Sequence, residues 1–274
     1  EEMHVEEDVL PLCRKAAQVT RLLESMKKPV IAAINGLALG GGNEFQMAAH
    51  YRIAEPQSEF GQPEINLHLI PRYRGTQRLV LLLVYHNSQS GIYDAIELIL
   101  GGRSIPATKA RELGLIHEVS DCSDALSRAV ELAVQYVNNP SESLVGFEHQ
   151  KRLAQNISWQ NKASIELSGL RSHPRVKRLI DQAVFANRQL PLSFALRAIE
   201  AGLEHGIDKG IDEESILFSK AVVSNEGGKF GIQAFFDRRS SPLPTKYYPE
   251  LELVRKNPNK YIDSGELLKL GSPF

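Results

Sequence analysis

The chain has 274 residues, 42% of them hydrophobic and 24% charged, with a formal net charge of −1. These values are typical of a globular protein with a sizeable core, and the near-zero net charge gives no indication of a nucleic-acid or membrane partner. The apolar runs are too short to span a membrane, and the separated Cys13 and Cys122 lack a CxxC motif, so we expect no disulfide framework, no metal site and a reducing, cytoplasmic location.

The first part of the chain alternates between helical and strand-like patterns. Residues 5–27 carry apolar side chains at helical spacing and predict an amphipathic helix that ends before Pro29. The residues expected on its core-facing side are Val9, Leu12, Ala16, Val19, Leu22, Leu23 and Met26. After it we expect a buried strand at 29–35, a helix at 43–51 and short strands at 52–55 and 58–62.

Beyond about residue 90 the chain becomes mostly helical. Helix periodicity or helix-start signals mark the segments 93–100, 106–114, 123–139, 191–206 and 212–224. One strand is expected in this half, at 115–119. The tail from Ser240 is rich in Pro, Lys and Tyr, which indicates an extension that packs loosely or against a partner.

The most unusual stretch is NGLALGGGNEF at 35–45, in which three glycines precede Glu44. It lacks the spacing of a dinucleotide or P-loop fingerprint, so nucleotide binding is not expected. A glycine turn that opens a helix exposes backbone N–H groups that can stabilise an anion, including one that develops during a reaction. Considered alone, the run is better explained by a turn chosen for tight packing, with Glu44 near the helix start for its charge.

A second carboxylate favours a catalytic role for this turn over a role in packing alone. Glu64 follows Pro63 and lies among apolar residues, twenty positions after Glu44. Burial and mutual repulsion raise the pKa of at least one member of such a pair, so that one carboxylate takes a proton while the other gives one. The two glutamates therefore predict acid/base chemistry at one site. The nearby His68 is expected to be structural or exposed, and His50 is expected to carry a favourable charge at a helix C-terminus.

With these residues in view, the segment 28–79 closely resembles the signature region of the crotonase superfamily, specifically its enoyl-CoA hydratases. The segments 97–121 and 214–239 resemble later parts of that family. The resemblance implies an α/β fold, a crotonase-like spiral of ββα turns with a helical C-terminal region that forms trimers. It also implies a homotrimer or a dimer of trimers, with no nucleic acid or membrane as partner.

The resemblance further implies a role for each matching residue. Gly41 donates its N–H to the thioester oxygen of an α,β-unsaturated acyl-CoA, as one donor of an oxyanion hole. Glu44 activates the water that attacks the β-carbon, and Glu64 protonates the α-carbon. No metal or other cofactor is expected, because coenzyme A is part of the substrate. The remaining residues expected around the substrate are Leu39, Gly40, Gly42, Pro63, Leu67 and Arg72.

Two other hypotheses about the function remain open beside hydration. Within the superfamily, the chain could be an enoyl-CoA isomerase, or a hydratase or hydrolase for a cyclic acyl-CoA. Outside enzymes, it could be a catalytically silent scaffold or an acyl-CoA-binding subunit. Members of the family that isomerise often lack one of the two carboxylates, so the presence of both favours hydration.

The sequence departs from the family in several places. The family has earlier strands and an A-G-A-D-I-K loop before its signature region, so we expect a fragment or a missing part on another chain. The core then occupies 1–140, a helical region with an insertion at about 142–190 occupies 141–240, and an extension occupies 241–274. Arg72 and Arg74 replace two glycines, and we expect them at the surface, with a carboxylate-bearing acyl group or a blocked tunnel as alternatives. The basic run at 171–178 is expected to form a solvated helix face.

Overall fold

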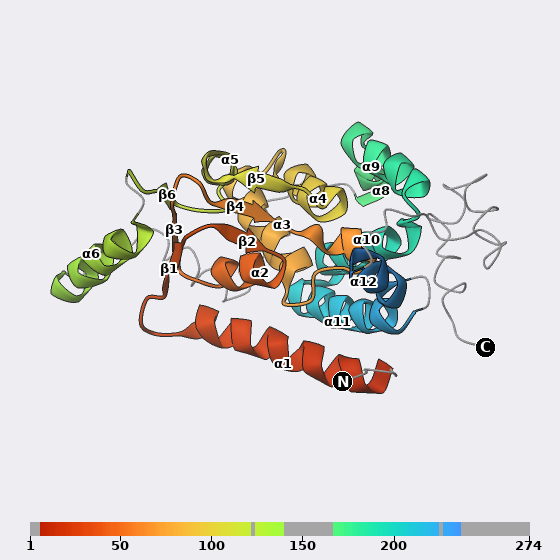
Figure 1. Ribbon diagram of the computed structural model, residues 1–274, viewed down its shortest axis with the longest axis horizontal. Coiled ribbons are helices and arrows are strands. Elements are labelled where there is room, and N and C mark those ends of the chain that lie inside the picture. The colour runs from red at the N-terminus through yellow and green to blue at the C-terminus, as the bar shows by residue number, and fades with distance from the viewer. Residues whose placement is uncertain (1–5, 122–123, 140–166, 225–226, 237–274) are drawn as a thin grey trace.

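The computed structural model describes residues 6–121, 124–139, 167–224 and 227–236. Small sheets form one part of this structure and a group of packed helices the other (Figure 1). The elements in chain order are α1 (Glu6–Ser25), β1 (Ile31–Ile34), β2 (Leu37–Leu39), α2 (Gly41–Met47), β3 (Tyr51–Ala54), β4 (Glu59–Gly61), the 3-10 helix η1 (Pro63–Leu67), α3 (Gly75–His86), α4 (Gly91–Gly101), β5 (Ser104–Pro106), α5 (Ala107–Glu112), β6 (Glu118–Val119), α6 (Ala125–Asn138), α8 (Leu167–Leu170), α9 (Pro174–Phe185), α10 (Gln189–His205), α11 (Ile207–Val223) and α12 (Gly228–Phe236).

The strands form two three-stranded sheets that the chain visits alternately. One sheet has the order β1-β3-β6, with all neighbours parallel, and the other has the order β2-β4-β5. β2 pairs with β4 in parallel, and β4 pairs with β5 in antiparallel orientation. Because β1 and β2 belong to different sheets and β3 and β4 repeat that placement, β1–β2–α2 and β3–β4–η1 are two successive, stacked turns of the chain.

The expected strands at 29–35, 52–55 and 58–62 are confirmed as β1, β3 and β4. The expected strand at 115–119 is reduced to the two residues of β6. β2 and β5 were not expected, because each has only three residues and lies beside glycines or a proline, so neither shows a strand pattern of useful length.

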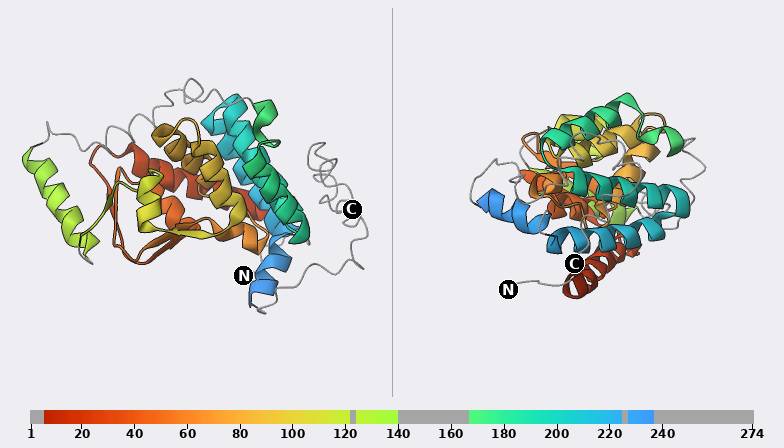
Figure 2. Two further views of the ribbon diagram at one scale, coloured as in Figure 1. Left: turned by 90° about the horizontal axis from the view of Figure 1, so that it is seen from above. Right: turned by 90° about the vertical axis from the view of Figure 1, so that its right-hand side faces the viewer.

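The helical half packs against α3 through close approaches of the backbone. α10 and α11 meet at Gly206, whose φ of 92° favours glycine, and pack along each other (Figure 2). A Cβ atom on Gly202 or Gly210 would lie 1.8 or 2.2 Å from the Gln77 side-chain oxygen. Gln77 in turn donates a hydrogen bond to the Ala198 carbonyl at 2.8 Å. Glycine at both helix positions therefore lets one buried amide of α3 lock the helix pair in place.

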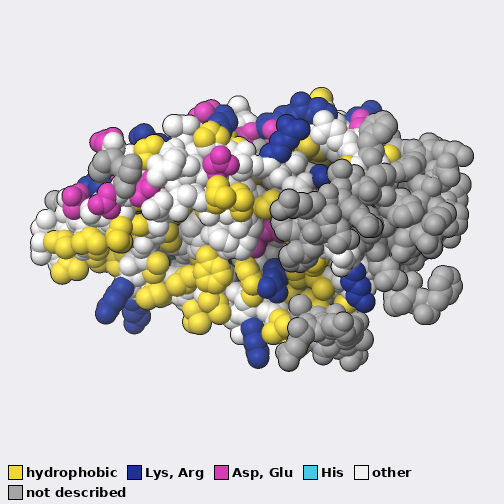
Figure 3. All heavy atoms as spheres, viewed as in Figure 1, with side chains coloured by type: hydrophobic (Ala, Val, Ile, Leu, Met, Phe, Trp, Pro, Cys, Tyr) yellow, Lys and Arg dark blue, Asp and Glu magenta, His cyan; other side chains and the backbone are white. Residues whose placement is uncertain are grey.

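The helix expected at 5–27 is confirmed as α1, but the predicted buried face is partly wrong. The side chains that α1 buries are Val9, Cys13, Ala17, Thr20 and Glu24. Leu12, Val19, Leu22 and Met26 are exposed, and hydrophobic side chains gather on this side of the molecule over α1 and α6 (Figure 3). α1 packs along α11, and this neighbour, together with the charged partners of Glu24, selects the buried face.

The expectation that Arg74 lies at the surface is wrong. Its side chain is buried and forms an ion pair with Glu24 of α1, which also accepts from Arg78 Nε at 2.6 Å.

His50, expected to carry a charge at a helix end, is buried as well. Its Nδ1 accepts from the Val30 N–H at 2.8 Å, and burial lowers the pKa of His50, so the ring is neutral near pH 7.

The insertion expected at 142–190 is described only from residue 167, and the extension at 241–274 lies outside the described residues. The basic run at 171–178 is partly a solvated face, since Lys177 and Arg178 are exposed while Arg171 and Arg175 are half-buried. Arg175 and Arg178 pair with carboxylates of α4, and Arg171 pairs with Glu200 of α10 at 2.7 Å. These pairs attach α9 to the rest of the helical half.

The Glu24 cluster yields a prediction about stability. Glu24→Gln leaves two buried guanidinium groups without their carboxylate, so we expect the free energy of unfolding to fall by about 3–5 kcal/mol. Arg21→Gln on the exposed side of α1 is the matched control, since its contact with Asp208 is long and solvated, and we expect a change below about 1 kcal/mol. Urea unfolding measures both, and equal effects of the two substitutions would contradict the role given to Glu24.

Candidate active site

The glycine turn between β2 and α2 brings two distant segments together. Gly40 adopts φ 53° and ψ −124°, and its N–H donates to the Gly61 carbonyl at 2.9 Å. A Cβ atom on Gly40 would lie 3.0 Å from the Glu64 Oε1. The positive φ and this close approach explain why glycine stands here: the turn lets the Glu64 carboxylate lie against the start of α2.

Gly41 is the first residue of α2, and among the described residues no acceptor takes its N–H. Its Cα faces the Tyr73 ring, whose Cε2 would lie 3.0 Å from a Cβ atom at this position. The helix start directs this free N–H and the positive end of the helix dipole outward. The other expected substrate contacts lie around it: Leu39 ends β2, Gly42 follows in α2, and Pro63 and Leu67 begin and end η1.

Glu44 is fully buried and its orientation is fixed by the backbone of a different segment. Its Oε1 accepts from the Tyr73 N–H at 2.8 Å and the Gly75 N–H at 2.7 Å. Burial raises the pKa of Glu44 to about 7, and the two backbone hydrogen bonds oppose this rise. Both of these hydrogen bonds reach Oε1, and the Arg72 backbone also stabilises the charged carboxylate.

Glu64 lies in η1 and is half-buried. Burial and the negative charge of Glu44 hold the pKa of Glu64 well above its usual value. With its amide turned to satisfy both groups, Gln62 donates to the two carboxylate oxygens at 3.1 and 3.2 Å. The structure therefore brings together the two glutamates expected from the sequence, close enough for the charge of one to act on the other.

A third buried carboxylate, Glu214 of α11, was missed by the sequence interpretation. Its Oε1 accepts from the Arg74 N–H at 2.7 Å, and its Oε2 accepts from the Thr76 N–H at 2.9 Å and the Thr76 hydroxyl at 2.5 Å. Burial and the charge of Glu44 raise the pKa of Glu214 to about 8. Its helical spacing from Leu217 and Phe218, both on the buried face of α11, is the signal that could have revealed it.

Arg72 and Tyr73 form one wall beside this turn. The Arg72 guanidinium lies 4.4 Å from the centre of the Tyr73 ring and 5.3 Å from that of Phe218, and it donates to the Tyr73 hydroxyl. Arg72 is half-buried rather than at the surface.

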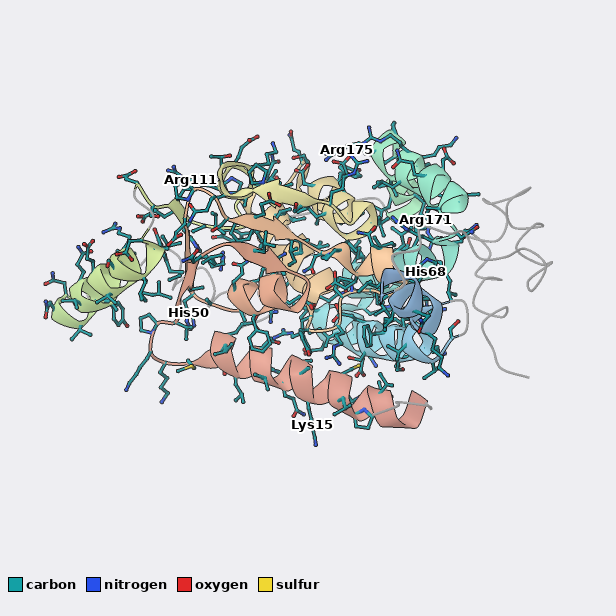
Figure 4. All side chains as sticks on the ribbon, in the orientation of Figure 1. Lys15, His50, His68, Arg111, Arg171 and Arg175 are labelled. Carbon is teal, nitrogen blue, oxygen red and sulfur yellow. The ribbon has the colours of Figure 1, made fainter. Side chains whose placement is uncertain are left out.

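His68, the residue after η1, is buried with φ 56°, so it caps η1 in a left-handed conformation. Figure 4 labels His68 beside α12.

The comparisons with known proteins agree with this geometry. Residues 10–170 match the family described as Enoyl-CoA hydratase/isomerase. The chain belongs to this family. It is 33% identical over 224 residues to the peroxisomal fatty acid beta-oxidation multifunctional protein AIM1 of Arabidopsis thaliana and 30% identical over 228 residues to the human peroxisomal bifunctional enzyme. Each match covers 81% of this chain but 28% of the relative, so the chain spans little more than a quarter of these multifunctional proteins.

A shorter relative and a solved structure extend this result. Over 122 residues the chain is 42% identical to the short-chain-enoyl-CoA hydratase of Clostridium acetobutylicum, a match that covers 44% of each chain. The crystal structure of an enoyl-CoA hydratase/isomerase from Pseudoalteromonas atlantica T6c aligns with a TM-score of 0.54 at 19% identity, covering 82% of this chain and 68% of the other. The expected crotonase-like α/β fold is thereby confirmed.

The described residues contain neither of two other kinds of site. No group of three or more His, Cys, Asp and Glu side chains there is arranged to hold a metal ion. No helix there is long and apolar enough to cross a membrane.

The buried carboxylates predict how stability depends on pH. The pKa values of Glu44 and Glu214 in the folded protein, about 7 and about 8, lie above the usual value, so the folded state holds protons that the unfolded state has released. Stability is therefore lost as the pH rises through these values. We expect the free energy of unfolding to fall by on the order of 3 kcal/mol between pH 6.5 and 8.5.

Urea unfolding at several pH values measures this slope. The chosen window avoids two groups with the opposite sign: the lowered pKa of His50 acts below it, and the pKa of Arg52, lowered by burial to about 9, acts above it. A free energy of unfolding that stays constant or rises across the window would show that these carboxylates are not protonated in the folded protein.

Proposed function

We propose that this chain hydrates an α,β-unsaturated acyl-CoA thioester to the 3-hydroxyacyl-CoA, as a lyase of fatty acid metabolism. The observation that carries the proposal is the free Gly41 N–H at the start of α2, next to two carboxylates whose pKa values are both raised by burial. Membership of the Enoyl-CoA hydratase/isomerase family supports it, as does the Clostridium relative that is named a hydratase.

In the proposed reaction the thioester oxygen accepts the Gly41 N–H. Glu44 takes a proton from a water molecule as the water oxygen bonds to the β-carbon. The π electrons move toward the thioester oxygen, and the resulting enolate is stabilised by the Gly41 N–H and the α2 dipole. Glu64 then gives its proton to the α-carbon, so that one water molecule has been added and the proton on Glu44 returns Glu64 to its starting state.

The surroundings of the two glutamates favour this division of roles. The Tyr73 and Gly75 N–H groups donate to Glu44 and stabilise its charged form, whereas Glu64 accepts from the Gln62 side-chain amide and from its own backbone. The negative charge of Glu44 further raises the pKa of Glu64. The proposal therefore assigns the role of base to Glu44 and the role of proton donor to Glu64.

The proposal also includes the substrate contacts and the assembly that the resemblance to the family implies. Leu39, Gly40, Gly42, Pro63 and Leu67 surround the acyl-CoA, Arg72 contacts its acyl portion, and coenzyme A enters only as part of the substrate. The assembly is a homotrimer or a dimer of trimers. A cytoplasmic location stays a prediction, because several matched relatives carry peroxisomal names.

The reaction is tested by the loss of crotonyl-CoA enoyl absorbance with the full-length protein. We expect Glu44→Gln and Glu64→Gln each to lower kcat by about 10²–10⁴-fold, since each removes a group that transfers a proton. Glu204→Gln, an exposed glutamate on α10, is the matched control and should leave kcat unchanged. Conversion of a 3-enoyl-CoA to its 2-enoyl isomer without hydration indicates the isomerase, and acyl-CoA binding without turnover indicates a silent scaffold; either result refutes the hydratase proposal.

The role of the Gly41 N–H is tested by a pair of substitutions at one position. Gly41→Pro removes the N–H, and proline is favoured at the first residue of a helix. Gly41→Ala keeps the N–H and adds the same Cβ contact with the Tyr73 ring. We expect kcat for Gly41→Pro to be about 10²–10³-fold below that of Gly41→Ala. Equal kcat values would mean that crowding against Tyr73, rather than a lost donor, accounts for the effect.

A further inference from the structure

A cavity of about 890 Å³ lies between α4, β5 and α9, and none of the candidate catalytic residues lines it. This volume is in the range of pockets that bind small organic molecules. Its walls combine two kinds of surface. The apolar part is contributed by Leu98, Ile105, Leu113, Leu179 and Ala183. The polar part includes five basic side chains, which are Arg103 after α4, Lys109 of α5, Arg175 and Arg178 of α9, and Arg188 before α10.

The two acidic residues of the lining are already neutralised. Arg175 of α9 lies 2.6 Å from Asp94 and 2.6 Å from Glu97 of α4, and Arg178 lies 2.8 Å from Glu97. Figure 4 labels Arg175 where α9 meets α4, and Figure 3 shows basic side chains gathered in this region. This network holds α9 against α4 as a wall of the cavity, and it leaves no acidic group of the lining to balance the other cations.

Two of those other cations have no carboxylate partner in the part of the chain that the structure describes. They are Arg103, which follows the end of α4, and Arg188, which precedes α10. Lys109, the third, pairs with Glu112 at 2.5 Å. Arg188 is half-buried, and burial lowers its pKa with no opposing charge. Buried guanidinium groups are normally paired, because a desolvated charge without a partner is costly.

We propose that this cavity binds an amphiphilic organic anion, with a carboxylate or phosphate head on Arg188 and Arg103 and an alkyl body on the leucine-lined wall. A small inorganic anion would leave the apolar wall exposed to water, and an uncharged lipid would leave Arg188 unpaired. The two surfaces together therefore select a molecule with both parts.

The cavity adjoins the segment that carries Glu64 without including that side chain. Asn66, two residues after Glu64 in η1, lines the cavity, and its side-chain N–H donates to the Gly102 carbonyl at 2.8 Å. The anion site is thus separate from the proposed reaction, and its occupancy does not depend on the hydratase proposal.

The test is isothermal titration calorimetry of the full chain with decanoate and, in a separate arm, decyl phosphate, which distinguishes the two head groups. We expect saturable binding of at least one of them, weakened about tenfold or more by Arg188→Gln and more modestly by Arg103→Gln, which is the more exposed. Arg197→Gln is the matched control: it lies on α10, pairs with Glu213 outside the lining, and should leave the affinity unchanged.

A second variant guards against misfolding. Ala186→Trp places a large side chain at the exposed rim of the cavity and should abolish binding without altering the melting temperature. The proposal is overturned if neither amphiphile binds, if decanol or inorganic phosphate binds as tightly as decanoate, or if correctly folded Arg188→Gln binds like the unmodified chain. Displacement of the probe by crotonyl-CoA with no effect of Arg188→Gln would assign the binding to the candidate active site and would equally overturn it.

Discussion

The arrangement of this molecule depends on the start of α3, where four successive backbone N–H groups meet two buried carboxylates. The N–H groups of Tyr73 and Gly75 donate to Glu44, and those of Arg74 and Thr76 donate to Glu214. Such groups have no partner within a helix, and the positive end of the helix dipole favours negative charge beside them. One helix start thereby fixes α2 and α11, which supply the two carboxylates, relative to each other.

The same segment also attaches α1, through the pairing of Arg74 and Arg78 with Glu24. Elements far apart in the chain are therefore joined by charge rather than by apolar packing alone. This arrangement is costly, because burial raises the pKa of Glu44 and Glu214. The arrangement also fixes the orientation of the carboxylate. Because two backbone donors hold one oxygen of Glu44, its other oxygen has a fixed position, as a base for the proposed reaction requires.

The sequence was sufficient for features that depend on local pattern. The apolar run of β1 indicated a strand, Glu44 and Glu64 stood out as a pair of carboxylates that the structure brings together, and the resemblance of 28–79 to the crotonase superfamily implied the fold. It was insufficient where a distant partner decides the outcome. Arg74 looked like a surface residue because its counter-charge, Glu24, lies 50 positions earlier. Glu214 was overlooked because its donors lie about 140 positions away, on a helix whose start has no capping side chain.

The same reasoning applies to α9, where the sequence showed only a basic run. In the structure Arg171, Arg175 and Arg178 pair with Glu200, Asp94 and Glu97, so these ion pairs join the segment to α4 and α10 even though Arg178 stays exposed. Because these acidic partners hold the helices together, two other cations of the cavity, Arg103 and Arg188, have no carboxylate partner among the described residues. A count of charges along the sequence gives a net value near zero and conceals this local excess. The excess appears only when each charge is assigned to its partner, and that assignment separates an arginine that holds the fold together from one that is available to a ligand.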